Sequence, residues 1–175
     1  MGAAVLVTGP PGCGKTTLIK SVVVALPVRA GGFFTEEIRD GDERIGFRVV
    51  ALDGTTGLLA HIRGVRGPRV GRYQVDVEGF ATVGVAALER ATREADLIVV
   101  DEIGKMELCC PAFLPVLEAA LASPKPLLGS ILAAPHPAVD ALKRRSQVEL
   151  YRLSARNRQD LTEALLARLT TEDSA

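Results

Sequence analysis

The sequence predicts an α/β fold with three layers, in which helices cover both faces of a mainly parallel sheet. Unbroken apolar runs such as residues 97–100 suit strands that are buried on both faces. Strand and helix patterns alternate through the second half of the chain, which is the order that produces a parallel sheet. We expect about five parallel strands and an antiparallel excursion inserted at roughly residues 32–77.

The first predicted strand, residues 5–8, leads into a turn of glycine and proline, and a helical pattern over residues 16–26 follows at once. The spacing G-x-x-x-x-G-K-S/T begins at Gly9 and ends at Thr16. Glycines let the backbone curl so that its N–H groups point at an anion, and the helix N-terminus adds partial positive charge. The residues expected to bind a nucleotide here are Gly9, Pro10, Pro11, Gly12, Cys13, Gly14, Lys15, Thr16 and Thr17.

Phosphate chemistry at this loop also needs a metal ion and a carboxylate. Lys15 is expected to reach the β- and γ-phosphates, and Thr16 to offer its hydroxyl to Mg²⁺. The strand over residues 97–100 ends in adjacent acidic residues, of which Asp101 is expected to hold Mg²⁺ directly or through water. Successive side chains of a strand point to opposite faces, so Glu102 is given a separate task, that of polarising the attacking water.

The antiparallel excursion is predicted from a turn signal between two strand patterns. Residues 33–39 and 43–52 flank the Asp40-Gly41 step, which is a strong short-range hairpin signal. A third short strand is expected over residues 58–62.

Residues 63–72 carry an arginine at every third position and no acidic residue. Glycine and proline within the stretch predict a loop rather than a helix face. Two interpretations remain open, a solvated loop and a lid that closes over a second substrate. A strand over residues 73–77 follows.

The remaining elements are predicted in simple alternation. Helices are expected over residues 78–94, near 111–122, over 137–145 and over 158–169, and strands over 97–100, 126–132 and 148–153. The polar tail, residues 170–175, is expected to fray. With no internal repeat or linker, residues 1–175 are expected to form a single domain.

Composition limits the classes of partner. The 21 basic and 21 acidic residues cancel, which argues against a general nucleic-acid or membrane surface. The short apolar segment at the start fits neither a signal peptide nor a membrane span. Three cysteines, an odd number, fit a reducing compartment. We therefore expect a cytoplasmic protein that is able to act as a monomer, with any protein partner left open.

Five segments in order along the chain resemble the THEP1 family of small nucleoside-triphosphatases. They are residues 9–18, 32–39, 44–47, 70–76 and 101–108. The resemblance implies the three-layer P-loop NTPase fold, slow hydrolysis of several ribo- and deoxyribonucleoside triphosphates, and an extra strand between the two motif strands.

The resemblance also bears on two further candidate site residues, and a third follows from its position in the sequence. The family's loop before the last helix usually ends in Asn-Arg, which Asn157 and Arg158 keep as expected nucleotide-binding residues, although Arg156 replaces a glutamate common before them. Lys105 lies just beyond the acidic pair and is a catalytic candidate together with Glu107. The alternative, that both merely begin a helix, stays open.

These observations predict a Mg²⁺-dependent nucleoside-triphosphatase that hydrolyses ATP, GTP and other nucleoside triphosphates with low turnover and broad base preference. Broad preference follows because the loop recognises phosphates and no base-specific motif is present. One alternative is a nucleotide or small-molecule kinase, which would need to exclude water and close on an acceptor. Another is a nucleotide-dependent switch that binds RNA or protein through the arginine-rich loop.

Overall fold

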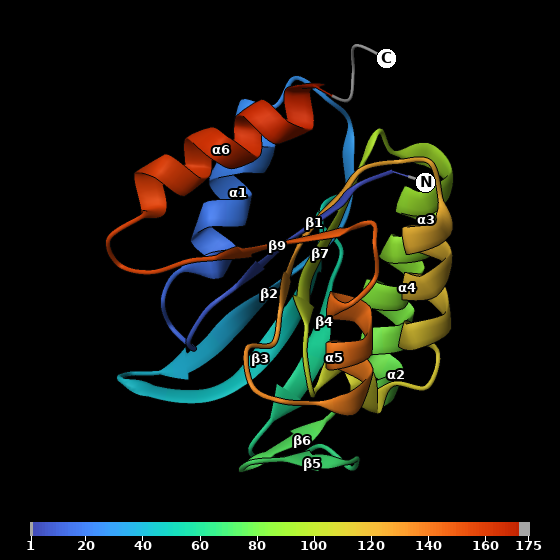
Figure 1. Ribbon diagram of the computed structural model, residues 1–175. Helices are drawn as coiled ribbons and strands as arrows, with labels where there is room; N and C mark the ends of the chain where they lie inside the picture. The colour runs from blue at the N-terminus through green and yellow to red at the C-terminus, as the bar shows by residue number, and fades with distance from the viewer. Residues whose placement is uncertain (1, 172–175) are drawn as a thin grey trace.

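Nine strands form one mixed sheet in the computed structural model, which describes residues 2–171 (Figure 1). Their order across the sheet is β5-β6-β4-β3-β2-β7-β8-β1-β9. The strands are β1 (Ala4–Thr8), β2 (Ala30–Asp40), β3 (Glu43–Ala51), β4 (Thr56–His61), β5 (Arg69–Val70), β6 (Tyr73–Val75), β7 (Leu97–Ile103), β8 (Leu127–Ile131) and β9 (Val148–Arg152). Five neighbouring strands of this order, β2-β7-β8-β1-β9, pair in parallel, which confirms the expected parallel sheet.

Helices cover both faces of this sheet. They are α1 (Lys15–Ala25), α2 (Val77–Phe80), the π-turn η1 (Ala81–Val85), α3 (Ala86–Glu94), the 3-10 turn η2 (Glu107–Cys109), α4 (Phe113–Ala122), α5 (Pro137–Lys143) and α6 (Arg158–Thr170). Helices α1 and α6 pack together on one face, and α3, α4 and α5 lie on the other (Figure 1). No helix among the described residues is long and apolar enough to cross a membrane.

Strand β1 shows why the core strands are apolar at every position. Val5 and Val7 pack against α1 and α6, whereas Ala4 and Leu6 pack into the core on the other face. All four side chains are buried, because successive residues of a strand point to opposite faces and both faces are covered. This arrangement holds the end of β1, where the phosphate-loop motif begins, between β8 and β9 in the parallel part of the sheet.

Strand β8 lies between β1 and β7 and pairs in parallel with both. The resemblance implied an extra strand at this place, and the structure confirms it. The order brings the carboxyl ends of β1, β8 and β7 side by side at one edge of the sheet.

The antiparallel region begins with β2, which also belongs to the parallel core. Residues 30–33 of β2 pair in parallel with β7, and from Phe33 onward the same strand pairs with β3 in the predicted hairpin. Gly41, with a φ of 59°, forms the turn in the left-handed conformation that favours glycine. The excursion therefore continues the core sheet, and its hairpin stands beside the carboxyl ends of the parallel strands.

Some boundaries differ from those predicted. Arg69 and Val70, expected within a loop, form the short strand β5, because Gly71 permits a tight turn back to β6. The helix predicted from residue 78 begins at Val77, since the Asp76 carboxylate accepts a hydrogen bond from the Gly79 N–H at 2.9 Å and caps it. Residues 172–175 of the tail expected to fray lie outside the described residues.

Candidate active site

The loop between β1 and α1 has the geometry of an anion cradle. Gly12 and Gly14 adopt φ angles of 74° and 93°, which side chains disfavour. Gly14 is the N-cap of α1, and no side chain caps the helix, so its first N–H groups remain available to an anion. The Lys15 ammonium folds back over the loop and donates to the Gly9 carbonyl at 2.8 Å and the Pro10 carbonyl at 3.3 Å.

Asp101 lies at the end of β7, directly beside the start of α1. The Thr16 hydroxyl donates to Asp101 Oδ2 at 2.7 Å, and the Ser130 hydroxyl donates to Asp101 Oδ1. Asp101 is only 1% exposed, and this burial raises the pKa of its carboxyl, while the two hydroxyl donors act in the opposite direction. The structure thus brings together the two residues that the sequence predicted as metal ligands.

These residues fit a magnesium ion. Thr16 and Asp101 present hard oxygen donors side by side, which is the ligand type that Mg²⁺ prefers. Among residues 2–171, no group of three or more histidine, cysteine, aspartate or glutamate side chains could hold a metal ion by itself. Mg²⁺ usually takes one or two carboxylates and completes its shell with phosphate and water.

Ser130 is a site residue that the sequence reasoning missed. It belongs to β8, where its side chain is fully buried in a strand that is otherwise apolar apart from a glycine. A lone hydroxyl within a buried strand was the available signal, because a buried polar group requires a hydrogen-bond partner.

Glu102 faces the cleft and Glu107 lies behind it. Burial raises the pKa of Glu102, the nearby Lys15 lowers it and Asp101 raises it. Glu107 is 4% exposed, and burial together with the charge of Glu102 raises its pKa well above the ordinary value. Both carboxylates approach Gly104, where a β-carbon would lie 2.6 Å from Glu102 Oε1 and 2.9 Å from Glu107 Oε2. Glu102 is therefore the carboxylate that can meet a substrate.

Lys105 occupies a different depression. Its exposed side chain lines a hollow of about 350 Å³ with residues from η2, α4 and the start of α5, among them Cys109, Leu114 and His136. It does not line the cleft in front of the phosphate loop. The structure thus separates Lys105 from Lys15 and Glu102.

The loop before α6 supports the phosphate loop from outside. Asn157 accepts a hydrogen bond from the Ser154 N–H and donates one to the Arg152 carbonyl, both at 2.8 Å. The Arg158 guanidinium donates to the carbonyls of Cys13 at 2.8 Å and Gly14 at 3.3 Å. Arg158 therefore contacts the phosphate loop directly, whereas the hydrogen bonds of Asn157 lie within the loop before α6.

A cleft of about 460 Å³ opens in front of the cradle, within the size range of small-molecule sites. One wall is the phosphate loop with Glu102, and another is the β2–β3 hairpin. The sequence left open whether the hairpin arginines Arg39, Arg44 and Arg48 meet phosphate or form its solvated face, and of these three only Arg44 is among the residues that line the cleft. The lining residues are Pro11, Gly12, Gly14, Lys15, Thr16, Thr17, Thr35, Glu36, Glu37, Arg44, Phe47 and Glu102.

Comparison with known proteins agrees with this geometry. A family model described as NTPase matches residues 4–166. Nucleoside-triphosphatase THEP1 of Thermotoga maritima is 44% identical over 163 residues, covering 93% of each chain. The crystal structure of THEP1 from the hyperthermophile Aquifex aeolicus superposes with a TM-score of 0.87 at 35% identity, covering 95% of this chain and 98% of that one. The solution structure of a human cancer-related nucleoside triphosphatase gives a TM-score of 0.78 at 35% identity, covering 97% and 98%.

Proposed function

Because the chain belongs to the NTPase family, we propose that it is a nucleoside-triphosphate phosphohydrolase that releases phosphate from ATP, GTP and other nucleoside triphosphates in a Mg²⁺-dependent reaction. One observation carries the proposal. The Thr16 hydroxyl meets the Asp101 carboxylate at 2.7 Å, and Glu102 lines the same cleft as Lys15 and Thr16. Phosphate binding, metal binding and water activation thus have candidate residues within one cleft.

Each residue then has a distinct task. The backbone N–H groups at the start of α1 and the Lys15 ammonium bind the β- and γ-phosphates. Thr16 and Asp101 would hold Mg²⁺, which would neutralise part of the charge of the phosphates. Glu102 orients a water molecule and accepts its proton as the water oxygen bonds to the γ-phosphorus. The bond from that phosphorus to the bridging oxygen breaks, and the nucleoside diphosphate leaves.

The raised pKa of Glu102 supports its assignment as the base. A catalytic base is most effective when its pKa approaches the working pH, and burial moves the pKa of Glu102 in that direction. Lys105 lines a separate hollow and Glu107 is buried behind Glu102, which supports Glu102 over both of these residues as the base.

Several finer properties belong to the same proposal. Low turnover is what the resemblance to the THEP1 family implies, and broad base preference is expected because the phosphate loop recognises phosphates and the sequence holds no clear base-specific motif. A cytoplasmic location is supported by the three free cysteines. A single domain over residues 1–175 is supported by the continuity of β2 through both parts of the sheet.

Water is favoured over a second substrate as acceptor. A kinase would need a lid that closes over the acceptor, and residues 63–72 were the candidate lid. These residues do not line the cleft, and Arg72 at their end contacts Glu43 and Arg44 on the hairpin instead.

The test is phosphate release from ATP, GTP, CTP and UTP, with Mg²⁺ and with the ion removed by chelation. Wild type should release phosphate from all four only when Mg²⁺ is present. Glu102→Gln should retain nucleotide binding and lose about 10²- to 10⁴-fold in kcat, because a positioned base contributes that much. The matched control is Glu89→Gln, on the exposed side of α3. An unchanged rate in Glu102→Gln would assign water activation to another group.

A further inference from the structure

The hairpin wall of the cleft contributes one arginine to its lining. Among residues 2–171, the basic side chains that line the cleft are Lys15 on the loop side and Arg44 on the hairpin side. Arg44 belongs to β3, and its side chain is 41% exposed. The two positive charges therefore lie on opposite walls of the same cleft.

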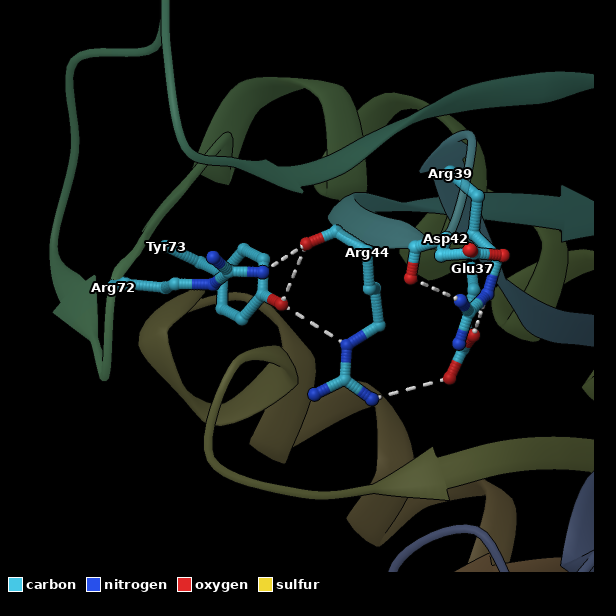
Figure 2. Close-up of polar contacts among 6 residues, drawn as sticks. All are labelled: Glu37, Arg39, Asp42, Arg44, Arg72 and Tyr73. Atoms are coloured by element: carbon cyan, nitrogen blue, oxygen red, sulfur yellow. Dashed lines mark hydrogen bonds and ion pairs between the residues drawn. The ribbon is translucent and has the colours of Figure 1, made fainter.

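Arg44 is held in position by a set of side chains that Figure 2 shows. Its Nε donates to the Tyr73 hydroxyl at 3.0 Å, and its Nη1 donates to Glu37 Oε1 at 3.1 Å. The guanidinium also lies 5.0 Å from the centre of the Phe47 ring and 5.8 Å from that of Tyr73, in cation–π contact with both. Within the described chain the remaining nitrogen, Nη2, makes no hydrogen bond and is available to a ligand.

The backbone carbonyl of Arg44 also accepts hydrogen bonds from two side chains. Arg72 donates to the Arg44 carbonyl (Figure 2). Arg72 also donates to Glu43 Oε1 at 2.9 Å. The Tyr73 hydroxyl donates to the same carbonyl at 3.2 Å. The end of the arginine-rich segment thus ties β6 to the hairpin and limits the movement of Arg44.

The acidic side chains of the hairpin wall are paired with cations. Glu36 pairs with Lys20 at 2.8 Å, and Glu37 pairs with Arg39 at 2.9 Å and with Arg44 at 3.1 Å. A γ-phosphate carries more negative charge than a carboxylate and develops charge on its equatorial oxygens as it is transferred. Such a group competes with Glu37 for the Arg44 guanidinium, whose planar set of donors matches phosphate oxygens.

We propose that Arg44 contacts the γ-phosphate of the bound nucleoside triphosphate and stabilises the transition state, as a catalytic arginine contributed by the same chain. Glu37 and Tyr73 act as positioning residues that hold the guanidinium in the cleft before the nucleotide binds. Arg44 forms no covalent bond, so the water oxygen still bonds to phosphorus and the nucleoside diphosphate still carries away the bridging oxygen. The inference rests on the proposed function, because it assigns a role in hydrolysis.

The first test compares Arg44→Ala with Arg48→Ala. Arg48 lies on the same strand, is exposed, and does not line the cleft. Arg44→Ala should lower kcat at least about 10²-fold and leave KM and nucleoside-diphosphate affinity within about threefold, because an arginine on the γ-phosphate is worth roughly 10³ to 10⁵ in kcat. Arg48→Ala should match wild type.

The second test separates a catalytic from a structural role. Nucleoside diphosphate with Mg²⁺ and fluoroaluminate mimics the transferred phosphoryl group, and Arg44→Ala should bind this combination about 10²-fold more weakly than wild type. Free guanidinium ion at millimolar concentration should partly restore kcat in Arg44→Ala. Tyr73→Phe, which keeps the ring and removes the hydroxyl, should lower kcat by less than Arg44→Ala does.

The outcomes are distinguishable. Wild type that releases no phosphate from any nucleotide would overturn the proposed function and this inference together. Active wild type with Arg44→Ala equal to it in kcat and in fluoroaluminate binding would overturn the inference alone. An increase in KM at unchanged kcat would overturn it too, since Arg44 would then bind substrate and transition state equally. If Arg44→Ala does not fold, Arg44→Lys applies the same criteria, because it keeps the charge and loses the planar donor set.

Discussion

At the scale of single residues, hydrogen bonds from neighbouring groups orient the charged side chains of the candidate site. Asp101 is buried but accepts two hydroxyl hydrogen bonds, from Thr16 and Ser130, so its carboxylate is oriented before any metal arrives. The Lys15 ammonium is satisfied by two loop carbonyls, which phosphate oxygens can replace without a large rearrangement.

Lys15 provides the prediction that belongs to this scale. Lys15→Ala removes the positive charge expected on the β- and γ-phosphates, and it should abolish productive nucleotide binding. Titration calorimetry with a non-hydrolysable triphosphate would measure the loss, with Lys143→Ala on α5 as the control. Normal turnover in Lys15→Ala would refute the phosphate-loop assignment.

At the scale of elements, the connection between β9 and α6 determines how the outer side of the phosphate loop is held. The Arg168 side chain of α6 forms hydrogen bonds with Glu149 of β9, at 2.9 Å from Nε and 2.6 Å from Nη2. The same helix begins with Arg158, which holds the loop carbonyls. Docking of α6 on β9 thus places Arg158.

This ion pair predicts a pH dependence of stability. The hydrogen bonds from Arg168 hold the pKa of Glu149 below its ordinary value. A carboxyl with a lowered folded-state pKa stabilises the fold above its unfolded pKa, and that contribution is lost as the pH falls through the folded value. Since the pair is about one-third exposed, its contribution is on the order of 1 kcal/mol.

Urea denaturation of wild type and Glu149→Gln would measure the effect. The two proteins should differ in the free energy of unfolding near neutral pH and converge in acid, where the wild-type carboxyl is protonated. Glu163→Gln, an exposed position on α6, should follow wild type throughout. A difference that persists undiminished in acid would show that the charge of Glu149 is not its cause.

At the scale of the whole molecule, an aromatic cluster joins the parallel core to its antiparallel extension. Phe33 lies on β2, where the pairing changes from parallel to antiparallel, and Phe80 and Phe113 come from the helices that cover this face. The rings pack edge to face, with centroids 5.4 Å apart for Phe33–Phe80 and Phe80–Phe113. All three side chains are fully buried.

This cluster predicts that core and extension unfold together. Phe113→Ala should lower the free energy of unfolding by about 3 to 5 kcal/mol, because it removes a buried ring and leaves a cavity. Val24→Ala, at a position 86% exposed, should change it by less than about 0.5 kcal/mol. Circular dichroism and hydrogen exchange in β3 and β4 should report one transition in the variant. An extension that unfolds separately would contradict the single-domain proposal.

The phosphate loop, its helix and the acidic pair near the end of β7 could be predicted from the sequence alone. These features are local, because a strand, a glycine turn and a helix start lie within a few residues and each residue type has its own chemical reason. The parallel core was predictable for a similar reason, since strands buried on both faces are apolar at every position. The place of β8 between β1 and β7 came only from the family resemblance.

The side chains that share the cleft with the phosphate loop depend on contacts between segments that are far apart in the sequence. Arg44 and Tyr73 are 29 residues apart, and so are Asp101 and Ser130, so neither contact leaves a pattern in the chain. Both depend on strand order and register, which long-range packing sets. Because of the same packing, Arg72 of the arginine-rich segment contacts the hairpin. Lys105 lies only three residues after Glu102 but lines a separate hollow, because the fold and not the distance along the sequence decides which side chains share a cleft.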